Sequence, residues 1–164
     1  MDMTDVHITR RGDWPMEMQI QANWQGKRHF IAEGASGHSV SIDAKADVGG
    51  EDKGVRPMEL LLMGLAGCTG IDVTMILEKM RQPLDGFRME VRGIRREEHP
   101  QAFTEIHIYY YIDGQVDEQK AWRAIRLSEE TYCSASASLK ADIVPHLILN
   151  GVEVAQTGAH GGQA

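Results

Sequence analysis

Alternating apolar and polar side chains in the first part of the sequence predict extended strands. Between residues 16 and 24 an apolar residue stands at every second position, which is the period of a strand with one buried face. Two further extended segments, at 28–33 and 38–43, follow short turns that contain glycine. Short strands joined by tight turns predict an antiparallel meander for the first third of the chain.

The pattern changes at Pro57, where a long apolar segment begins. Proline suits the first position of a helix, and the next proline is Pro83, so one long helix is predicted between them. Most of this segment is apolar on nearly every side, which is typical of a helix buried by its own domain and by a partner subunit. Gly64, Gly67 and Gly70 each cost about 1 kcal/mol relative to alanine in a helix. Their repetition predicts the close approach of a backbone or a substrate.

The second half of the chain predicts strands at 87–94 and 104–112, followed by helices. Asp117 is suited to cap an amphipathic helix, a short third helix is expected at 134–139, and a strand pair surrounds the turn at 150–151. This order shows little of the repeated strand–helix–strand alternation that a parallel sheet requires. The prediction is an α+β fold with an antiparallel sheet and a long buried central helix.

The size of the chain favours a single domain. It has 164 residues, a mass of 18.3 kDa and 42% apolar residues, enough for one continuous core. We expect one domain over residues 1–164, with a core at about 16–155 and flexible ends.

The charge and the apolar runs exclude several classes of partner. The formal net charge is -7, whereas nucleic-acid binding needs clustered lysine and arginine. No run approaches the roughly 20 apolar residues that cross a bilayer, and the first residues lack the apolar core of a signal peptide. The sequence therefore predicts a cytoplasmic protein with no nucleic-acid or membrane partner.

Two cysteines, Cys68 and Cys133, are the candidates for chemistry. Cys68 lies in the apolar helix among small residues that leave its sulfur accessible, and Cys133 lies at a junction between helical segments, where unpaired backbone N–H groups would stabilise a thiolate. Two cysteines are too few for a disulfide scaffold, and the ordinary interpretation is a pair of buried, inert thiols. The seven histidines show no metal-ligand spacing with either cysteine, so no metal site is predicted.

Three blocks of sequence carry a resemblance to a known family. They are PMELLL at 57–62, GCTGIDV at 67–73 and LSEETYCSAS at 127–136. Together they resemble the OsmC/Ohr family (osmotically inducible and organic hydroperoxide resistance proteins) in its YhfA-like branch, over about residues 16–155. The resemblance implies the OsmC-like fold as an intertwined homodimer, with two sites at the subunit interface and no metal or organic cofactor.

The resemblance also implies an activity in oxidative stress. Cys68 matches the peroxidatic cysteine of the family and Cys133 the resolving cysteine of the same chain. The implied reaction is reduction of an organic hydroperoxide to an alcohol, through a sulfenic acid on Cys68 and then a Cys68–Cys133 disulfide. A dithiol, in some family members a lipoylated protein, would reopen the disulfide.

Family members activate the first cysteine with an arginine and a glutamate. Glu59 is the matching glutamate of the OsmC branch, but a separation of nine residues puts it opposite Cys68 on a regular helix, so it would need a loop or an irregular first turn. Arg28 and Arg56 are the candidate arginines, and each also fits an ordinary surface cation. Asp72 shares the helix face of Cys68, where its charge disfavours a thiolate. A site role for Asp72 and a structural hydrogen bond from the partner subunit or from a strand are both open.

A second function stays open from the sequence. Met58 stands where the Ohr pattern has its glutamate, directly after the proline, and the activating arginine is not identified. These departures favour a non-catalytic alternative, in which a stress-accessory or small-ligand-binding dimer keeps the OsmC fold.

Overall fold

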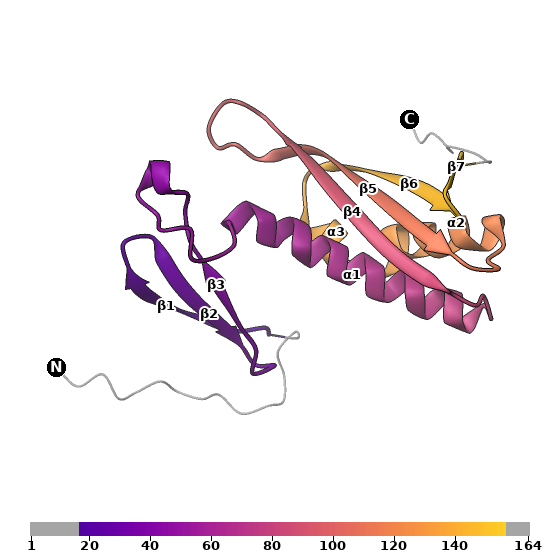
Figure 1. The fold of residues 1–164 in the computed structure, drawn as a ribbon, viewed down its shortest axis with the longest axis horizontal. Coiled ribbons are helices and arrows are strands. Elements are labelled where there is room, and N and C mark those ends of the chain that lie inside the picture. The colour runs from indigo at the N-terminus through magenta and orange to yellow at the C-terminus, as the bar shows by residue number, and fades with distance from the viewer. Residues whose placement is uncertain (1–16, 157–164) are drawn as a thin grey trace. The chain divides into compact units, whose positions relative to one another are not determined.

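The computed structural model describes residues 17–156 as two compact units, one ending at Pro57 and one beginning at Met58 (Figure 1). The ends that the sequence predicts to be flexible, 1–16 and 157–164, lie outside the described residues. The same holds for Met16 of the first predicted strand and for the segment compared with a signal peptide.

The N-terminal unit contains the predicted meander. Its strands are β1 (Ile20–Gly26), β2 (His29–Gly34) and β3 (Ser39–Ile42). They form one antiparallel sheet in the order β1-β2-β3, which confirms the meander. A short 3₁₀ helix, η1 (Ala46–Val48), follows in the loop.

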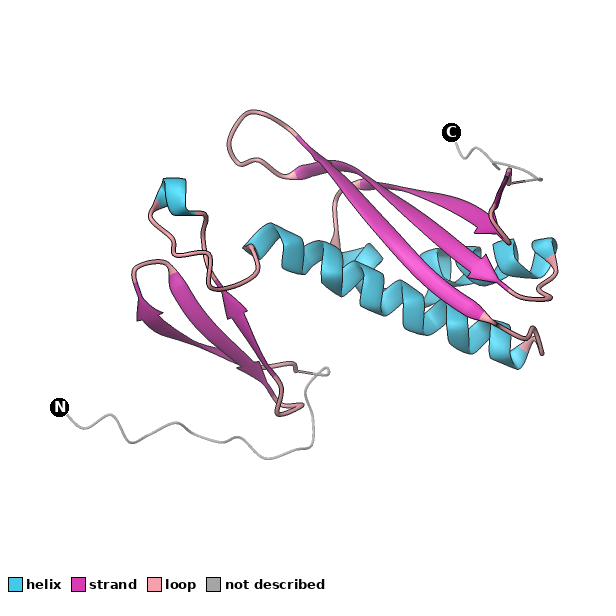
Figure 2. Cartoon of the chain, viewed as in Figure 1, coloured by secondary structure: helices cyan, strands magenta, loops and turns pink. Residues whose placement is uncertain are grey.

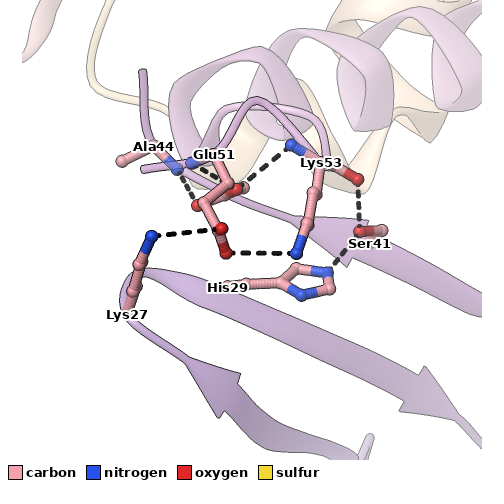
Figure 3. A network of polar contacts seen from close by, with 7 residues as sticks. Lys27, His29, Ser41, Ala44, Glu51 and Lys53 are labelled. Atoms are coloured by element: carbon pink, nitrogen blue, oxygen red, sulfur yellow. Dashed lines mark hydrogen bonds and ion pairs between the residues drawn. The ribbon is translucent and has the colours of Figure 1, made fainter. Parts of the chain in front are cut away.

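Asp43 holds the loop that follows β3. Its carboxylate is 1% exposed and accepts backbone N–H hydrogen bonds from Ala44, Glu51 and Lys53, at 2.8, 3.0 and 3.1 Å. Burial alone would raise the pKa of Asp43, but these three hydrogen bonds outweigh it and the pKa lies below its ordinary value. Gly50 is required in this loop because a Cβ there would overlap the carbonyl group of Ala44. Figure 3 shows the side chains around the loop, with the Glu51 carboxylate joined to the ammonium groups of Lys27 and Lys53.

The C-terminal unit is a four-stranded sheet with helices packed against one face (Figure 2). Its elements are α1 (Pro57–Lys79), β4 (Gly86–Arg95), β5 (Phe103–Asp113), α2 (Glu118–Leu127), a π-helical turn η2 (Ser128–Tyr132), α3 (Ser134–Ser138), β6 (Asp142–Leu149) and β7 (Val152–Val154). The strand order is β4-β5-β6-β7. The Asp117 side chain caps α2 by accepting a hydrogen bond from the Lys120 N–H, as predicted.

The α+β class is confirmed, but one pair of strands is not antiparallel. β5 and β6 run parallel, while β4–β5 and β6–β7 are antiparallel. The expectation of an antiparallel sheet is therefore corrected to a mixed sheet. The reason is the connection: the chain leaves the end of β5, passes through α2, η2 and α3, and returns to start β6 beside the start of β5.

One stripe of α1 enters the core. Leu65, Val73 and Leu77 are fully buried, and they belong to the same hydrophobic cluster as the inward residues of β5, such as Ile108 and Tyr110. The buried positions on α1 recur at about every fourth residue, the spacing of one helix face. The central helix is therefore buried on one side within this chain.

The other side of α1 is apolar and exposed within the described part of the C-terminal unit. Leu61, Met63, Ile71 and Met75 are between 45% and 63% exposed. By length and composition α1 is also apolar enough to cross a membrane, with 22% of its most apolar stretch buried. The sequence-based expectation that no run reaches this length was wrong, although the core helix of a globular protein has the same composition. Among the described residues, a Cβ added at Gly70 would lie 3.0 Å from the Met89 sulfur, whereas one added at Gly64 or Gly67 would meet nothing within 4 Å.

Candidate functional site

Cys68 and Cys133 meet in the C-terminal unit. Cys68 is half-buried near the middle of α1, and Cys133 is 3% exposed between η2 and α3. Both are free thiols. The two sulfurs and a carboxylate oxygen of Asp72 all lie within 4.8 Å of one another. A disulfide bond is about 2.05 Å long, so the sulfurs need to approach by less than about 2.8 Å to form one.

Local backbone geometry positions Cys133. The Cys133 N–H donates to the Ser128 carbonyl oxygen at 2.8 Å, closing the π-helical turn. Cys133 is then the N-cap residue of α3, and its sulfur accepts the Ser136 N–H at 3.3 Å. This is the backbone N–H contact that the sequence predicted.

The environment of Cys133 disfavours its ionised form. Burial raises the pKa of the Cys133 thiol, the neighbouring Cys68 raises it further, and the Ser136 N–H only partly opposes this. Cys133 is therefore suited to remain a protonated thiol beside the more exposed Cys68.

Asp72 is held in place by Ser128. The Ser128 hydroxyl is fully buried and donates to Asp72 Oδ2 at 3.1 Å, across 56 residues of sequence. Asp72 lies one helical turn after Cys68, so its carboxylate projects from the same side of α1. The sequence left open a hydrogen bond to Asp72 from a strand or from the partner subunit, but the donor is Ser128 at the start of η2 in the same chain.

An apolar cavity is lined in part by Asp72, the residue whose carboxylate lies near the two cysteine sulfurs. It has a volume of about 300 Å³ and is lined by one carboxylate, one lysine and five mainly apolar side chains: Asp72, Met75, Ile76, Lys79, Met80, Leu127 and Tyr132. Tyr132 directly precedes Cys133 in sequence. The cavity is large enough for a small organic molecule.

Glu129 is a buried acid that sequence inspection did not single out. Within residues 17–156, its Oε1 atom is buried without a hydrogen-bond partner. Burial, with a smaller contribution from the Glu130 carboxylate, raises the pKa of Glu129 to about 7. The nearby Tyr110 hydroxyl is itself buried, and burial and the charge of Glu129 raise its pKa. The only sequence signal for Glu129 was its place four residues before Cys133.

Glu59 does not reach Cys68 within one chain. α1 is helical from Pro57 onward, so the loop or irregular first turn that Glu59 needed is not present. Nine residues of regular helix separate the two side chains by about 13.5 Å along the axis and by half a turn. Glu59 lines a different hollow, with Leu62, Met63, Ala66, Met89 and Val91. Within one chain, the structure therefore does not bring Glu59 to the cysteine pair.

Both candidate arginines belong to the N-terminal unit. Arg56 is half-buried, donates to the carbonyl oxygens of Asp43 and Gly54 at 3.2 and 2.8 Å, and forms an ion pair with Asp52. Arg28 is exposed and donates to the Lys27 carbonyl oxygen at 3.3 Å. Arg56 therefore contributes to the loop between β3 and α1.

The fold and the site define a class: an α+β protein with a pair of free thiols, one on a long central helix and the other beyond a helical crossover. The OsmC-like protein family model matches residues 50–147. The chain belongs to the OsmC/Ohr family, as the resemblance of its three sequence blocks implied.

Relatives of known sequence or structure agree with this assignment. Protein YhfA of Escherichia coli (strain K12) is 36% identical over 124 residues, which is 75% of this chain and 90% of YhfA. The crystal structure of a hypothetical protein from Aquifex aeolicus VF5 is 32% identical, with a TM-score of 0.69 over 82% of this chain and 98% of that one. An organic hydroperoxide resistance protein OsmC from Legionella pneumophila shares the fold at 15% identity, with a TM-score of 0.59 over 84% and 98% of the two chains.

Proposed function

We propose that this protein is a cysteine-based peroxidase that reduces organic hydroperoxides, with Cys68 as the peroxidatic and Cys133 as the resolving residue. The observation that supports it most directly is the approach of the two sulfurs to within 4.8 Å as free thiols. Two solved structures with a similar fold carry the name organic hydroperoxide resistance protein. Their names support the same proposal.

The accessibility of the two thiols supports the assignment of roles. Cys68 is half-buried, whereas Cys133 is 3% exposed and burial raises its pKa. The more accessible sulfur is suited to meet the peroxide first, because the reaction needs an exposed thiolate. The buried thiol is suited to react second, with the oxidised neighbour.

The proposed reaction balances in three steps. The Cys68 thiolate attacks the distal peroxide oxygen, which carries the hydrogen, and the O–O bond breaks. Cys68 becomes a sulfenic acid, and the alkoxide leaves and takes up a proton to give the alcohol. Cys133 attacks the Cys68 sulfur, releasing water and forming the disulfide. A dithiol reductant, for example a lipoylated protein, then reduces the disulfide by thiol exchange and is itself oxidised to a disulfide.

The apolar cavity supports an organic substrate. Its volume of about 300 Å³ and its methionine, isoleucine and leucine walls suit the carbon chain of a hydroperoxide rather than hydrogen peroxide. Asp72 stands where this cavity approaches the sulfurs. We propose that the organic group occupies the cavity and directs its O–O bond toward Cys68.

We further propose that the working form is a homodimer in the cytoplasm. The apolar side chains on the uncovered side of α1 support a second copy as the cover, because a second α1 presents the same apolar surface. The positive charge that stabilises the Cys68 thiolate is proposed to come from Arg28 or Arg56. Separate alanine substitutions of the two arginines identify which one lowers turnover.

Stopped-flow turnover of cumene hydroperoxide with a lipoyl or dithiothreitol reductant tests the function. We expect turnover in the wild type and none in Cys68→Ser. Cys133→Ser should still reduce one equivalent of hydroperoxide but fail to form the intrachain disulfide. Wild-type turnover in Cys68→Ser would overturn the proposal.

A further inference from the structure

Three side chains at the cysteine pair have the composition of a transition-metal site. Cys68, Asp72 and Cys133 each offer one ligand atom, and the three atoms lie within 4.8 Å of one another. Zinc binds cysteine sulfur at about 2.3 Å and carboxylate oxygen at about 2.0–2.2 Å in tetrahedral geometry. Ligand atoms of such a site lie roughly 3.5–3.8 Å apart, so small side-chain movements bring these three atoms into position.

The arrangement of the ligands on the fold favours a preformed site. Cys68 and Asp72 are one turn apart on α1, which is helical on both sides of them. Cys133 approaches from the junction of η2 and α3, where its backbone N–H is fixed to Ser128. Two ligands on a helix and one from a separate element leave the fourth tetrahedral position open for water.

The two described hydrogen bonds to the ligands resemble the outer contacts of metal centres. The buried Ser128 hydroxyl donates to Asp72 Oδ2 at 3.1 Å, leaving the other carboxylate oxygen for a metal. The Ser136 N–H donates to the Cys133 sulfur at 3.3 Å. Both donors are neutral, so neither of these contacts offsets the negative charge that the three ligands carry once zinc displaces the two thiol protons.

We propose that the reduced protein binds one Zn²⁺ per chain through Cys68, Asp72 and Cys133, with water as the fourth ligand. Binding displaces the protons of the two thiols and exchanges them for a divalent cation. Two sulfur ligands favour zinc over magnesium or calcium, which prefer oxygen ligands. The carboxylate distinguishes the site from a purely thiolate Cu(I) site. The sequence predicted no metal site because the seven histidines show no metal-ligand spacing with either cysteine, whereas the third ligand here is an aspartate.

Zinc binding and the disulfide exclude each other, because both use the two sulfurs. In the oxidation of the zinc form, the two thiolates and two protons react with one organic hydroperoxide to give the disulfide, an alcohol, water and free Zn²⁺. Bound zinc therefore keeps the two sulfurs in the reduced state, and oxidation by the hydroperoxide releases the zinc ion. This redox step rests on the proposed peroxidase function; the binding of zinc does not.

Zinc binding is tested without peroxide, so that its failure is separate from failure of the peroxidase. The reduced full-length protein, in a phosphine reductant, competes with a chromophoric chelator for added Zn²⁺. We expect one Zn²⁺ per chain, lost in Cys68→Ser and in Cys133→Ser. Asp72→Asn should weaken affinity by about tenfold or more, because it removes the charged ligand, and Ser128→Ala by about tenfold, because it removes the outer hydrogen bond.

Glu78→Gln is the matched control, because it neutralises an exposed acid on the same helix. It should leave the affinity unchanged, and circular dichroism checks that each variant is folded. Added Co²⁺ should give thiolate-to-cobalt charge transfer and tetrahedral d–d bands in the wild type, and altered bands in Asp72→Asn. Fewer than one Zn²⁺ per chain, or wild-type affinity and cobalt spectrum in folded Asp72→Asn, would overturn the three-ligand site.

Discussion

The Ser128 hydroxyl donates a hydrogen bond to Asp72 Oδ2 at 3.1 Å and so joins the central helix to the turn that leads to Cys133. Ser128 also accepts the Cys133 N–H through its carbonyl oxygen. One buried serine therefore contacts both sides of the dithiol site, and the geometry between Cys68 and Cys133 depends on it.

Removing the Asp72 carboxylate, which accepts the hydrogen bond from Ser128, should destabilise the fold. Asp72→Ala leaves the fully buried Ser128 hydroxyl without its hydrogen bond, which typically costs about 1–3 kcal/mol. Urea unfolding at fixed protein concentration measures the loss. The Asp72→Ala and Ser128→Ala double variant should lose less than the sum of the two single variants by about 1 kcal/mol. Strict additivity would mean that the two side chains do not interact.

Glu129 should make stability depend on pH near neutrality. Its folded pKa of about 7 lies above the ordinary value of 4.5, so between these values the folded chain keeps a proton that the unfolded chain releases. Glu129 therefore makes its full contribution to the free energy of unfolding below about pH 4.5. This contribution falls as the pH rises toward 7, by about 3 kcal/mol in total.

The matched substitutions for this prediction are Glu129→Gln and, as a control, Glu118→Gln on the exposed start of α2. Glu129→Gln should flatten the pH dependence of the unfolding free energy between pH 5 and 8, while the control should keep it. An unchanged pH profile in Glu129→Gln would assign the dependence to another group.

The two thiols should differ in reactivity. Cys133 is 3% exposed and burial raises its pKa above the ordinary 9.0, so iodoacetamide at pH 8 should modify Cys68 well before Cys133. Mass spectrometry of peptides from a time course gives the two rates. Faster modification of Cys133 would reverse the proposed roles.

The uncovered apolar side of α1 should be a dimer contact. Light scattering after size exclusion should give about twice the 18.3 kDa chain mass. Ile71→Asp places a charge on this face, where the side chain is 63% exposed in the chain, and should shift the protein to a monomer. Gln119→Asp, exposed on α2, should leave the dimer intact. A stable wild-type monomer in dilute buffer would contradict the proposal.

Local patterns in the sequence predicted most of the elements. Alternation revealed the strands, Pro57 marked the start of α1, and Asp117 marked the start of α2, because each of these signals acts over a few residues. The parallel pairing of β5 and β6 was missed, since strand direction depends on the path of the whole crossover between them.

The sequence blocks predicted the two cysteines of the site but not the contacts that hold them in place. Cys68 and Cys133 were identified by their surroundings and by the family resemblance. The Ser128–Asp72 hydrogen bond was not, because it spans 56 residues and leaves no local pattern. The π-helical turn that buries Glu129 was equally hidden, since its sequence is also compatible with an ordinary helix.

The most direct test of the central claim is non-reducing peptide mapping after one equivalent of cumene hydroperoxide. The proposed mechanism predicts a Cys68–Cys133 disulfide within one chain, formed in the wild type and absent in both Cys68→Ser and Cys133→Ser. Mixing unlabelled with isotope-labelled protein distinguishes links within a chain from links between chains. A link between chains, or Cys68 left as a stable sulfenic or sulfinic acid with Cys133 still free, would contradict it.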